Sequence, residues 1–251
     1  MTTGPPSTHA HPTLPEALKE AALVRDAYFP GDRLYAVENG PSGFTAENPE
    51  HQPKIKYLML MRNESLARLK TRYDDATGSL RIDQEGRVAA QGDMARPEGR
   101  KAIEDFLAGY MPGELRGPPK VLAAPGGYRF TDSRRGFVSL INLASVAAIE
   151  ALVDAPVHPL RFRGNIYVGD MPAWRELDLV DAEIAIGAEV RLRVLKRIER
   201  CAATNVDPDT GERDLKIPTA LMKAFDHTDC GIYAQVIAGG TVKPGDAIRV
   251  I

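Results

Sequence analysis

The sequence predicts a mainly β protein with a few short helices, of the α+β class. It contains 22 glycines and 19 prolines scattered between short runs, which is the pattern of a fold with many turns. In several of those runs apolar residues alternate with polar ones, as they do in strands with one buried face. The chain has 251 residues, 43% of them hydrophobic and 26% charged, so it is long and apolar enough to bury a core.

The expected strands follow from alternation and from β-branched or aromatic composition. In order, they are RLYAV after Asp32, residues 55–61, residues 160–168, residues 190–194, residues 232–236 and residues 247–251. In the run 160–168 the alternation would place Arg161, Arg163 and Asn165 on one face.

Helices are expected at three places where apolar residues recur every three or four positions. Asn63 and Asn142 are the predicted N-caps of two of them, because an Asn side chain accepts hydrogen bonds from free N–H groups in the first turn. The three apolar stripes consist of Leu66, Leu69 and Tyr73, of Ile103, Phe106, Leu107 and Tyr110, and of Val146, Ile149 and Leu152.

The Gly- and Pro-rich segment 113–127 predicts a domain boundary. We expect a mobile lead over residues 1–15, a β-rich domain over 16–120 and a second domain over 121–251. The lead is rich in Ser, Thr, Pro and His and offers little to bury.

Charge and hydropathy narrow the classes of partner. The 32 basic and 34 acidic side chains give a formal charge of −2, so we expect neither nucleic acid nor a membrane as a partner. The apolar stretches are far shorter than the roughly 20 residues that cross a bilayer. The N-terminus shows no secretory or lipidation pattern, so a cytoplasmic location is expected.

Cys201 is the first candidate for chemistry, because Arg200 precedes it and a cationic neighbour favours the thiolate. The alternative for any lone cysteine is a buried, inert side chain, which is the interpretation we give Cys230. Arg161, Arg163 and Asn165 could together hold a phosphate through charged hydrogen bonds, or could be a solvated strand face. The five histidines show no zinc-ligand spacing.

Several strings in fixed order resemble the MOSC domain, the family named for the C-terminal domain of molybdenum cofactor sulfurases, which also includes the amidoxime-reducing components. They are RFRGNI at 161–166, WRE at 174–176, RCAATNVDPDTG at 200–211, and GIYAQV followed by VKPGDAIRV near the C-terminus. The stretch PGDR at 30–33, with LYAVENG after it, resembles the domain that precedes MOSC in that family.

The resemblance implies a MOSC-type β-barrel with a smaller β-rich N-terminal domain, and a molybdenum cofactor (molybdopterin). Cys201 would be the metal ligand and catalytic residue. The resemblance places further side chains at the cofactor: Arg33, Asn142, Ser145, Arg163, Asn165 and Arg200. Pyridoxal phosphate is a weaker alternative at the level of the family.

The activity implied is reduction of N-hydroxylated or other N-oxygenated small molecules by oxygen-atom transfer, with a separate electron-donor protein. The alternatives are a non-catalytic carrier that holds the cofactor, or sulfur on Cys201, and an interaction domain with an empty site. One departure favours these alternatives: members of the family usually begin with a PVK[SG] motif, whereas Thr13, Leu14 and Pro15 follow His11 and Pro12 here.

Overall fold

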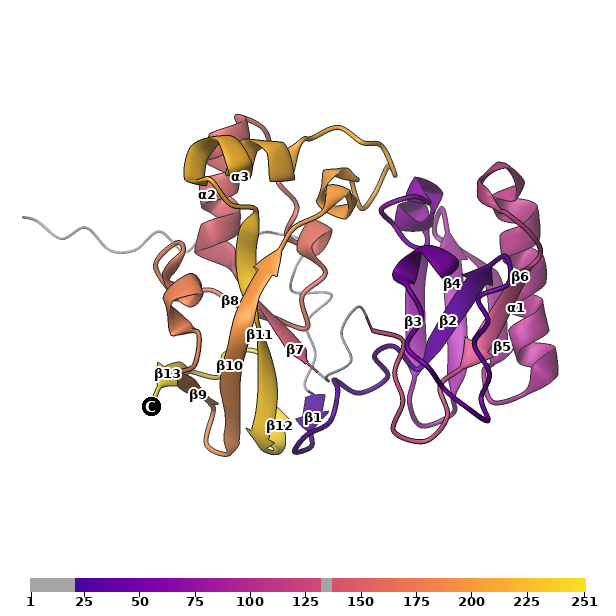
Figure 1. Cartoon of the computed structure of the whole chain (residues 1–251), viewed down its shortest axis with the longest axis horizontal. Helices are drawn as coiled ribbons and strands as arrows, with labels where there is room; N and C mark the ends of the chain where they lie inside the picture. The colour runs from indigo at the N-terminus through magenta and orange to yellow at the C-terminus, as the bar shows by residue number, and fades with distance from the viewer. Residues whose placement is uncertain (1–20, 132–136) are drawn as a thin grey trace, which may run out of the picture. The chain divides into compact units, whose positions relative to one another are not determined.

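Residues 21–131 and 137–251 are described by the computed structural model, and within them the chain forms 13 strands and three α-helices (Figure 1). The predicted mainly β, α+β class is therefore confirmed. The predicted lead, residues 1–15, lies outside the described residues. Within the described ranges, no helix combines the length and the apolar content needed to cross a membrane.

The described residues belong to two compact units that are not continuous in sequence. Unit 1 contains residues 21–27, 137–200 and 216–251, and unit 2 contains residues 28–131 and 201–215. The division into domains at residue 120 stays a prediction. The segment 201–215, which begins with Cys201, belongs to unit 2 although its sequence neighbours on both sides belong to unit 1.

A six-stranded sheet forms the centre of unit 1, and only its β7–β8 pair is parallel. In spatial order its strands are β13 (Ile248–Val250), β9 (Glu183–Ile186), β10 (Val190–Glu199), β11 (Asp229–Ala238), β7 (Val138–Asn142) and β8 (Ile166–Val168). A separate two-stranded sheet pairs β1 (Ala21–Leu23) with β12 (Gly240–Val242). The described strands thus form open sheets, and closure into a barrel stays a prediction.

The long hairpin of β10 and β11 follows from the alternation in the sequence. Leu192 and Val194 face Val236 and Ala234 across the pair, and all four side chains are buried. Figure 1 shows these two strands running side by side through unit 1. The strands predicted over 190–194, 232–236 and 247–251 are confirmed.

Two helices complete unit 1, α2 (Leu143–Val153) and α3 (Ile217–Phe225). The predicted cap of α2 is confirmed, because the Asn142 Oδ1 atom accepts a hydrogen bond from the Ala144 N–H over 3.0 Å. Asn142 is the last residue of β7, so the passage from strand to helix is sharp.

Unit 2 is built from two small sheets and one helix. Its strands are β2 (Tyr35–Asn39), β3 (Lys70–Asp74), β4 (Ser79–Gln84), β5 (Arg87–Asp93) and β6 (Pro119–Ala123), and its helix is α1 (Pro97–Tyr110). The apolar stripe of α1 buries Ile103 and Leu107 against Ile82 of β4, as the spacing predicts. A Cβ atom on Gly99 would lie 2.0 Å from the Asp93 carbonyl oxygen, so glycine lets α1 begin directly against β5.

Two predicted elements of unit 2 are wrong. Residues 55–61 form no strand, because a short 3-10 helix, Lys54–Lys56, is followed by a single bridge at Tyr57. The helix predicted after Asn63 ends at Arg68, and Leu69 leads into β3, which contains Tyr73. Pairing of β3 with β4 outweighs the helical spacing of these apolar residues.

The strand predicted over 160–168 is also wrong in its first half. Pro159–Phe162 is a 3-10 helix, Arg163 has a positive φ of 51°, and β8 begins only at Ile166. Gly164 allows this turn, since a Cβ atom there would lie 2.4 Å from Ile141 Cγ1. Arg161, Arg163 and Asn165 therefore do not share a strand face.

Candidate functional site

The predicted site residues are divided between the two units. Unit 2 contains Arg33 and Cys201, whereas unit 1 contains Asn142, Ser145, Arg163, Asn165 and Arg200. The peptide bond between Arg200 and Cys201 is where the chain leaves unit 1 and enters unit 2.

Cys201 is a free, half-buried cysteine in an extended conformation, immediately before the 3-10 helix Ala202–Asn205. Its carbonyl oxygen accepts hydrogen bonds from Thr204, from the N–H over 3.1 Å and from Oγ1 over 3.0 Å. The main chain at Cys201 is thereby fixed by the turn that follows it. The position of the thiol at a structured turn is consistent with a ligand or nucleophile role.

The Arg200 guanidinium joins two parts of unit 1. Its Nε atom donates to the Cys230 carbonyl over 2.7 Å, its Nη2 atom donates to the same oxygen, and Nη1 donates to the Phe162 carbonyl over 3.0 Å. The guanidinium also lies over the Phe162 ring, 5.3 Å from its centroid. Arg200 thus ties β11 to the turn that carries Arg163.

Arg163 and Asn165 lie on that turn and differ in their surroundings. Arg163 is exposed, and its left-handed backbone ends the 3-10 helix Pro159–Phe162. Asn165 is half-buried, and its Oδ1 atom accepts from the Ser139 N–H over 2.9 Å and from Ser139 Oγ over 2.8 Å. Asn165 therefore holds the turn to β7, whereas Arg163 lies at the surface of unit 1. Arg161, by contrast, is 2% exposed, which excludes the solvated face considered above.

Asn142 and Ser145 are fully buried around a carboxylate that the sequence reasoning did not select. The Glu176 Oε2 atom accepts from Asn142 Nδ2 over 2.8 Å and from Ser145 Oγ over 2.9 Å. The Trp174 N–H donates to Ser145 Oγ over 2.8 Å, and the Gly231 N–H donates to Glu176 Oε1 over 3.4 Å. We call Asn142, Ser145 and Glu176 the buried network.

The buried network fastens the end of β7, the start of α2 and the strand β11 to the 3-10 helix Arg175–Leu179. All three side chains are 0% exposed. A contact between Asn142 or Ser145 and a cofactor stays a prediction, and their observed bonds give them a supporting role. The sequence signal for Glu176 was its place in the WRE string at 174–176, beside Trp174 and Leu177.

Cys230 differs from Cys201 in its burial. It is fully buried in β11, and this burial raises the pKa of its thiol to about 12, against a lowering influence of Arg200. The thiol is protonated at neutral pH. The interpretation of Cys230 as an inert core residue agrees with this environment.

Arg33 lies in unit 2 with a positive φ of 55°, and its side chain pairs with Asp32. Its carbonyl oxygen accepts from the Phe130 N–H over 3.1 Å, so this hydrogen bond joins the PGDR stretch at 30–33 to Phe130. A role for Arg33 at a cofactor stays a prediction.

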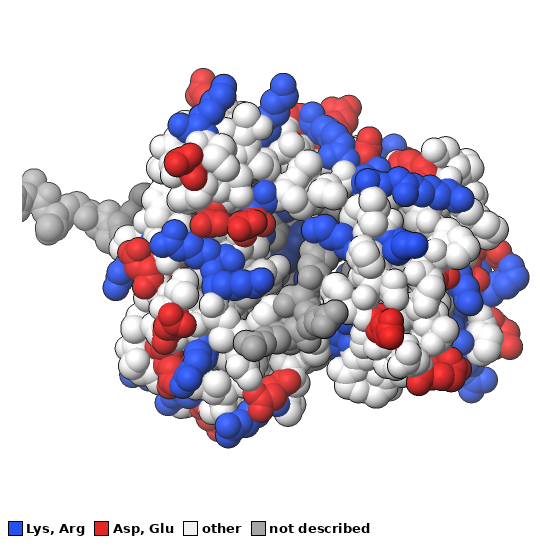
Figure 2. Space-filling model, viewed as in Figure 1, with Lys and Arg blue, Asp and Glu red and all other residues white. Residues whose placement is uncertain are grey.

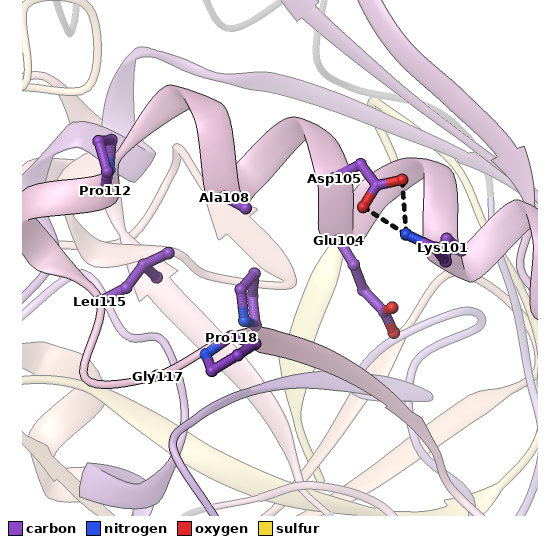
Figure 3. Close-up of a pocket in the computed structure, with 9 residues that line it drawn as sticks. Lys101, Glu104, Asp105, Ala108, Pro112, Leu115, Gly117 and Pro118 are labelled. Atoms are coloured by element: carbon purple, nitrogen blue, oxygen red, sulfur yellow. Dashed lines mark hydrogen bonds and ion pairs between the residues drawn. The ribbon is translucent and has the colours of Figure 1, made fainter.

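Two surface hollows of unit 2 are lined by other residues. One, of about 480 Å³, lies beside α1, where Lys101 pairs with Asp105 (Figure 3) and the Glu104 Oε1 atom accepts from the Val121 N–H. The other, of about 700 Å³, is lined by aromatic and polar side chains including Tyr28, His51 and Arg129.

The face of the molecule in Figure 2 carries cationic and anionic side chains side by side.

The residues present fit a metal that is coordinated mainly by a cofactor and not by protein side chains. Among residues 21–131 and 137–251, no three His, Cys, Asp or Glu side chains gather as a metal site. Cys201 in unit 2 offers a thiol, a ligand type that suits a soft metal, and Arg163 in unit 1 offers a guanidinium, a group that suits an anionic phosphate.

Comparisons with known proteins identify the family of part of the chain. The family model described as MOSC domain matches residues 127–249. Mitochondrial amidoxime reducing component 2 of Bos taurus is 32% identical over 123 residues, and molybdenum cofactor sulfurase of Caenorhabditis briggsae is 31% identical over 134 residues. The match to the bovine protein covers 44% of this chain and 36% of that protein, and the match to the nematode protein covers 47% and 18%.

The crystal structure of YiiM from Geobacillus stearothermophilus is similar to this chain with 15% identity and a TM-score of 0.36, over 45% of this chain and 53% of that one. The chain thus spans only about a third or less of the length of these two curated relatives. Residues 127–249 of this chain are a MOSC domain.

Proposed function

We propose that this protein binds a molybdenum cofactor and reduces N-hydroxylated or related N-oxygenated small molecules. The observation that supports this most directly is the contrast of its two cysteines: Cys201 is a half-buried free thiol at a structured turn, whereas Cys230 is buried and protonated. The similarity to amidoxime-reducing components and to a molybdenum cofactor sulfurase supports molybdenum over pyridoxal phosphate.

In the proposed mechanism, the cofactor supplies the two-electron chemistry that removes an oxygen atom from the substrate. Removing the oxygen of an N-hydroxyl group consumes two electrons and two protons and releases water. A separate electron-donor protein would return the electrons. Cys201 would ligate the metal as the thiolate, because a soft sulfur donor suits this metal.

The other residues bind and position. The exposed Arg163 guanidinium would hold the cofactor phosphate by charged hydrogen bonds, and Asn165 would keep the turn of Arg163 on β7 through its bonds to Ser139. Arg200 has committed donors to two carbonyl oxygens, so it would act mainly by fixing the same turn from the side of β11. Asn142 and Ser145 would support the sheet end through Glu176.

A carrier that holds the cofactor, or sulfur as a persulfide on Cys201, is the second candidate function. The absence of the PVK[SG] motif at residues 11–15 favours it, because a lysine that reaches the cofactor in the family is missing. The two functions differ in turnover: a carrier would hold molybdenum or sulfane sulfur without reducing a hydroxylamine.

The test is purification from a host that makes the cofactor, with molybdenum and pterin measured per chain and reduction of an amidoxime followed with an artificial electron donor. We expect close to one molybdenum per wild-type chain, and loss of nearly all turnover in Cys201→Ser, because serine lacks the soft sulfur ligand. Cys230→Ala is the matched control and should retain turnover. Equal turnover in wild type and Cys201→Ser would contradict a metal-ligand role for Cys201.

A further inference from the structure

The segment 201–215 of unit 2 is a folded loop that begins at Cys201, and Arg213 near its end contacts other residues of the same unit. Val206 and Arg213 form an isolated β-bridge, and the Asp207 N–H donates to the Glu212 carbonyl over 2.8 Å. The Asp207 side chain accepts from the N–H groups of Asp209 and Thr210, which closes the turn between them. The loop therefore brings Arg213 back beside the residues that follow Cys201.

The Arg213 guanidinium joins the start of this loop to the body of unit 2. Its Nη1 atom donates to the carbonyl of Ala202, the residue after Cys201, over 3.2 Å. Its Nη2 atom donates to the Met61 carbonyl over 2.8 Å and to the Glu64 Oε2 atom over 2.9 Å. One planar side chain thus holds three oxygen atoms from two separate segments, which only a forked donor can do.

The surface that receives Arg213 is itself anchored. The 3-10 helix Glu64–Arg68 is held by Asn63, whose Nδ2 atom donates to the Glu114 carbonyl, and by Tyr110, whose hydroxyl donates to the Ser65 carbonyl over 2.9 Å. A hydrogen bond from a main-chain N–H and the bond from Arg213 lower the pKa of Glu64, so its carboxylate is charged at neutral pH.

Two further contacts press the tip of the loop onto the same surface. The Lys70 Nζ atom lies 2.6 Å from Asp209 Oδ1 and 2.9 Å from the Pro208 carbonyl oxygen. Gly211 has a φ of +75°, and a Cβ atom there would lie 3.0 Å from Arg68 Cγ and 3.2 Å from the Glu64 carbonyl oxygen. A larger residue at 211 would lift the loop from unit 2.

We infer that Arg213 is a positioning residue for Cys201: it fixes the main chain next to the thiol by clamping Ala202 to Met61 and Glu64. This role rests on the proposed function, in which Cys201 ligates the metal, and extends it to a residue outside the cysteine's immediate surroundings. Arg213 acts through the main chain and has no part in the chemistry itself.

The test begins with the cofactor-free full-length chain and hydrogen exchange of the amides of Thr204, Val206 and Gly211, all of which donate to main-chain oxygens within the loop. In Arg213→Ala we expect these amides to exchange about tenfold faster, as loss of charged hydrogen bonds predicts. Arg213→Lys should lie between, because lysine keeps the charge facing Glu64 but lacks the fork. Arg87→Ala, at an exposed arginine of β5, is the control and should change nothing.

The second readout is the electron paramagnetic resonance spectrum of Mo(V) in the loaded chain. We expect Arg213→Ala to retain molybdenum while its spectrum moves toward that of Cys201→Ser, and Arg213→Lys to restore the wild-type spectrum in part. If Arg213→Ala does not fold, Glu64→Gln weakens the same clamp and should show the same two changes in smaller degree.

Unchanged exchange of the loop in Arg213→Ala would overturn the clamp. Faster exchange with a wild-type spectrum would overturn its role in positioning Cys201. A wild-type chain without molybdenum would instead contradict the proposed function, and the exchange experiment would still decide whether Arg213 holds the loop.

Discussion

The buried network of unit 1 and the Cys201 loop of unit 2 use polar side chains in opposite ways. Asn142, Ser145 and Glu176 are 0% exposed, and the hydrogen bonds described above join them only to residues of unit 1. The loop is held by Arg213 and Lys70, whose ionic partners Glu64 and Asp209 are partly or mostly exposed. The buried network holds secondary-structure elements of unit 1 together, whereas the surface contacts of Arg213 can position the main chain next to Cys201 without burying the thiol. The sequence resemblance selected Asn142 and Ser145 of the network and Cys201 of the loop, but not Arg213 or Lys70.

This comparison predicts that the buried network dominates stability. Glu176→Ala would remove the carboxylate that accepts from the Ser145 hydroxyl and the Gly231 N–H in a site closed to water, and would leave the Asn142 amide with only the Pro172 carbonyl of its two acceptors. We expect the free energy of unfolding to fall by about 3 kcal/mol or more. Denaturant unfolding of the cofactor-free chain measures it, and Glu199→Ala, at an exposed glutamate of β10, should cost little. Equal stability of the two variants would show that the network is dispensable.

A smaller effect, on binding rather than on folding, is expected at Arg163. Removal of a guanidinium that holds a phosphate should weaken cofactor binding about tenfold or more, since such hydrogen bonds contribute about 1.5 to 3 kcal/mol. Arg163 is exposed, so Arg163→Ala should leave the thermal midpoint of the cofactor-free chain nearly unchanged.

The measurement at Arg163 is molybdenum per purified chain beside the thermal midpoint, with Arg249→Ala, an exposed arginine of β13, as the control. A variant that melts far lower yet keeps full molybdenum would make Arg163 a structural residue.

An effect confined to alkaline pH is expected at Cys230. Burial raises the pKa of Cys230 from 9.0 to about 12, so between these values the unfolded chain loses a proton that the folded chain retains. Stability should therefore be intact below pH 9 and decrease above it, by at most about 1.4 kcal/mol per pH unit from this group. Cys230→Ala should show a flatter decrease between pH 9 and 11 than wild type in denaturant unfolding. Identical slopes would mean that Cys230 is not buried as described.

Regular alternation and capping predicted part of unit 1, namely β10, β11, β13 and the helix that follows β7, but not β7 or β9 of its sheet. The strands around Leu192 and Ile232 and the helix capped by Asn142 depend on local spacing, and local spacing is visible in the sequence. The 3-10 turn at Pro159 and the positive φ of Arg163 depend on the approach of Gly164 to Ile141, a contact between distant residues. No local pattern reports such a contact, so the predicted strand face with three polar side chains was wrong.

The site was predictable in its residue types but not in their surroundings. The cation Arg200 precedes Cys201 and the anion Asp229 precedes Cys230, so the sequence distinguishes the two cysteines, whereas the full burial of Cys230 is visible only in the structure. Glu176 and Arg213 were missed because their partners, such as Asn142 and Met61, lie tens of residues away. A side chain that acts through long-range hydrogen bonds leaves no spacing in the sequence to detect.

The pairing of β1 with β12 has a consequence for how the chain folds during synthesis. Ala21 leaves the ribosome early, yet its partner Val242 follows more than two hundred residues later. The loop that begins at Cys201 likewise reaches its anchor at Met61 only after most of unit 2 has been made. Closing contacts of such long sequence separation is slow. Completion of each unit therefore waits on late-made residues, and a chain stalled before residue 201 would expose the surface around Glu64 that the loop later covers.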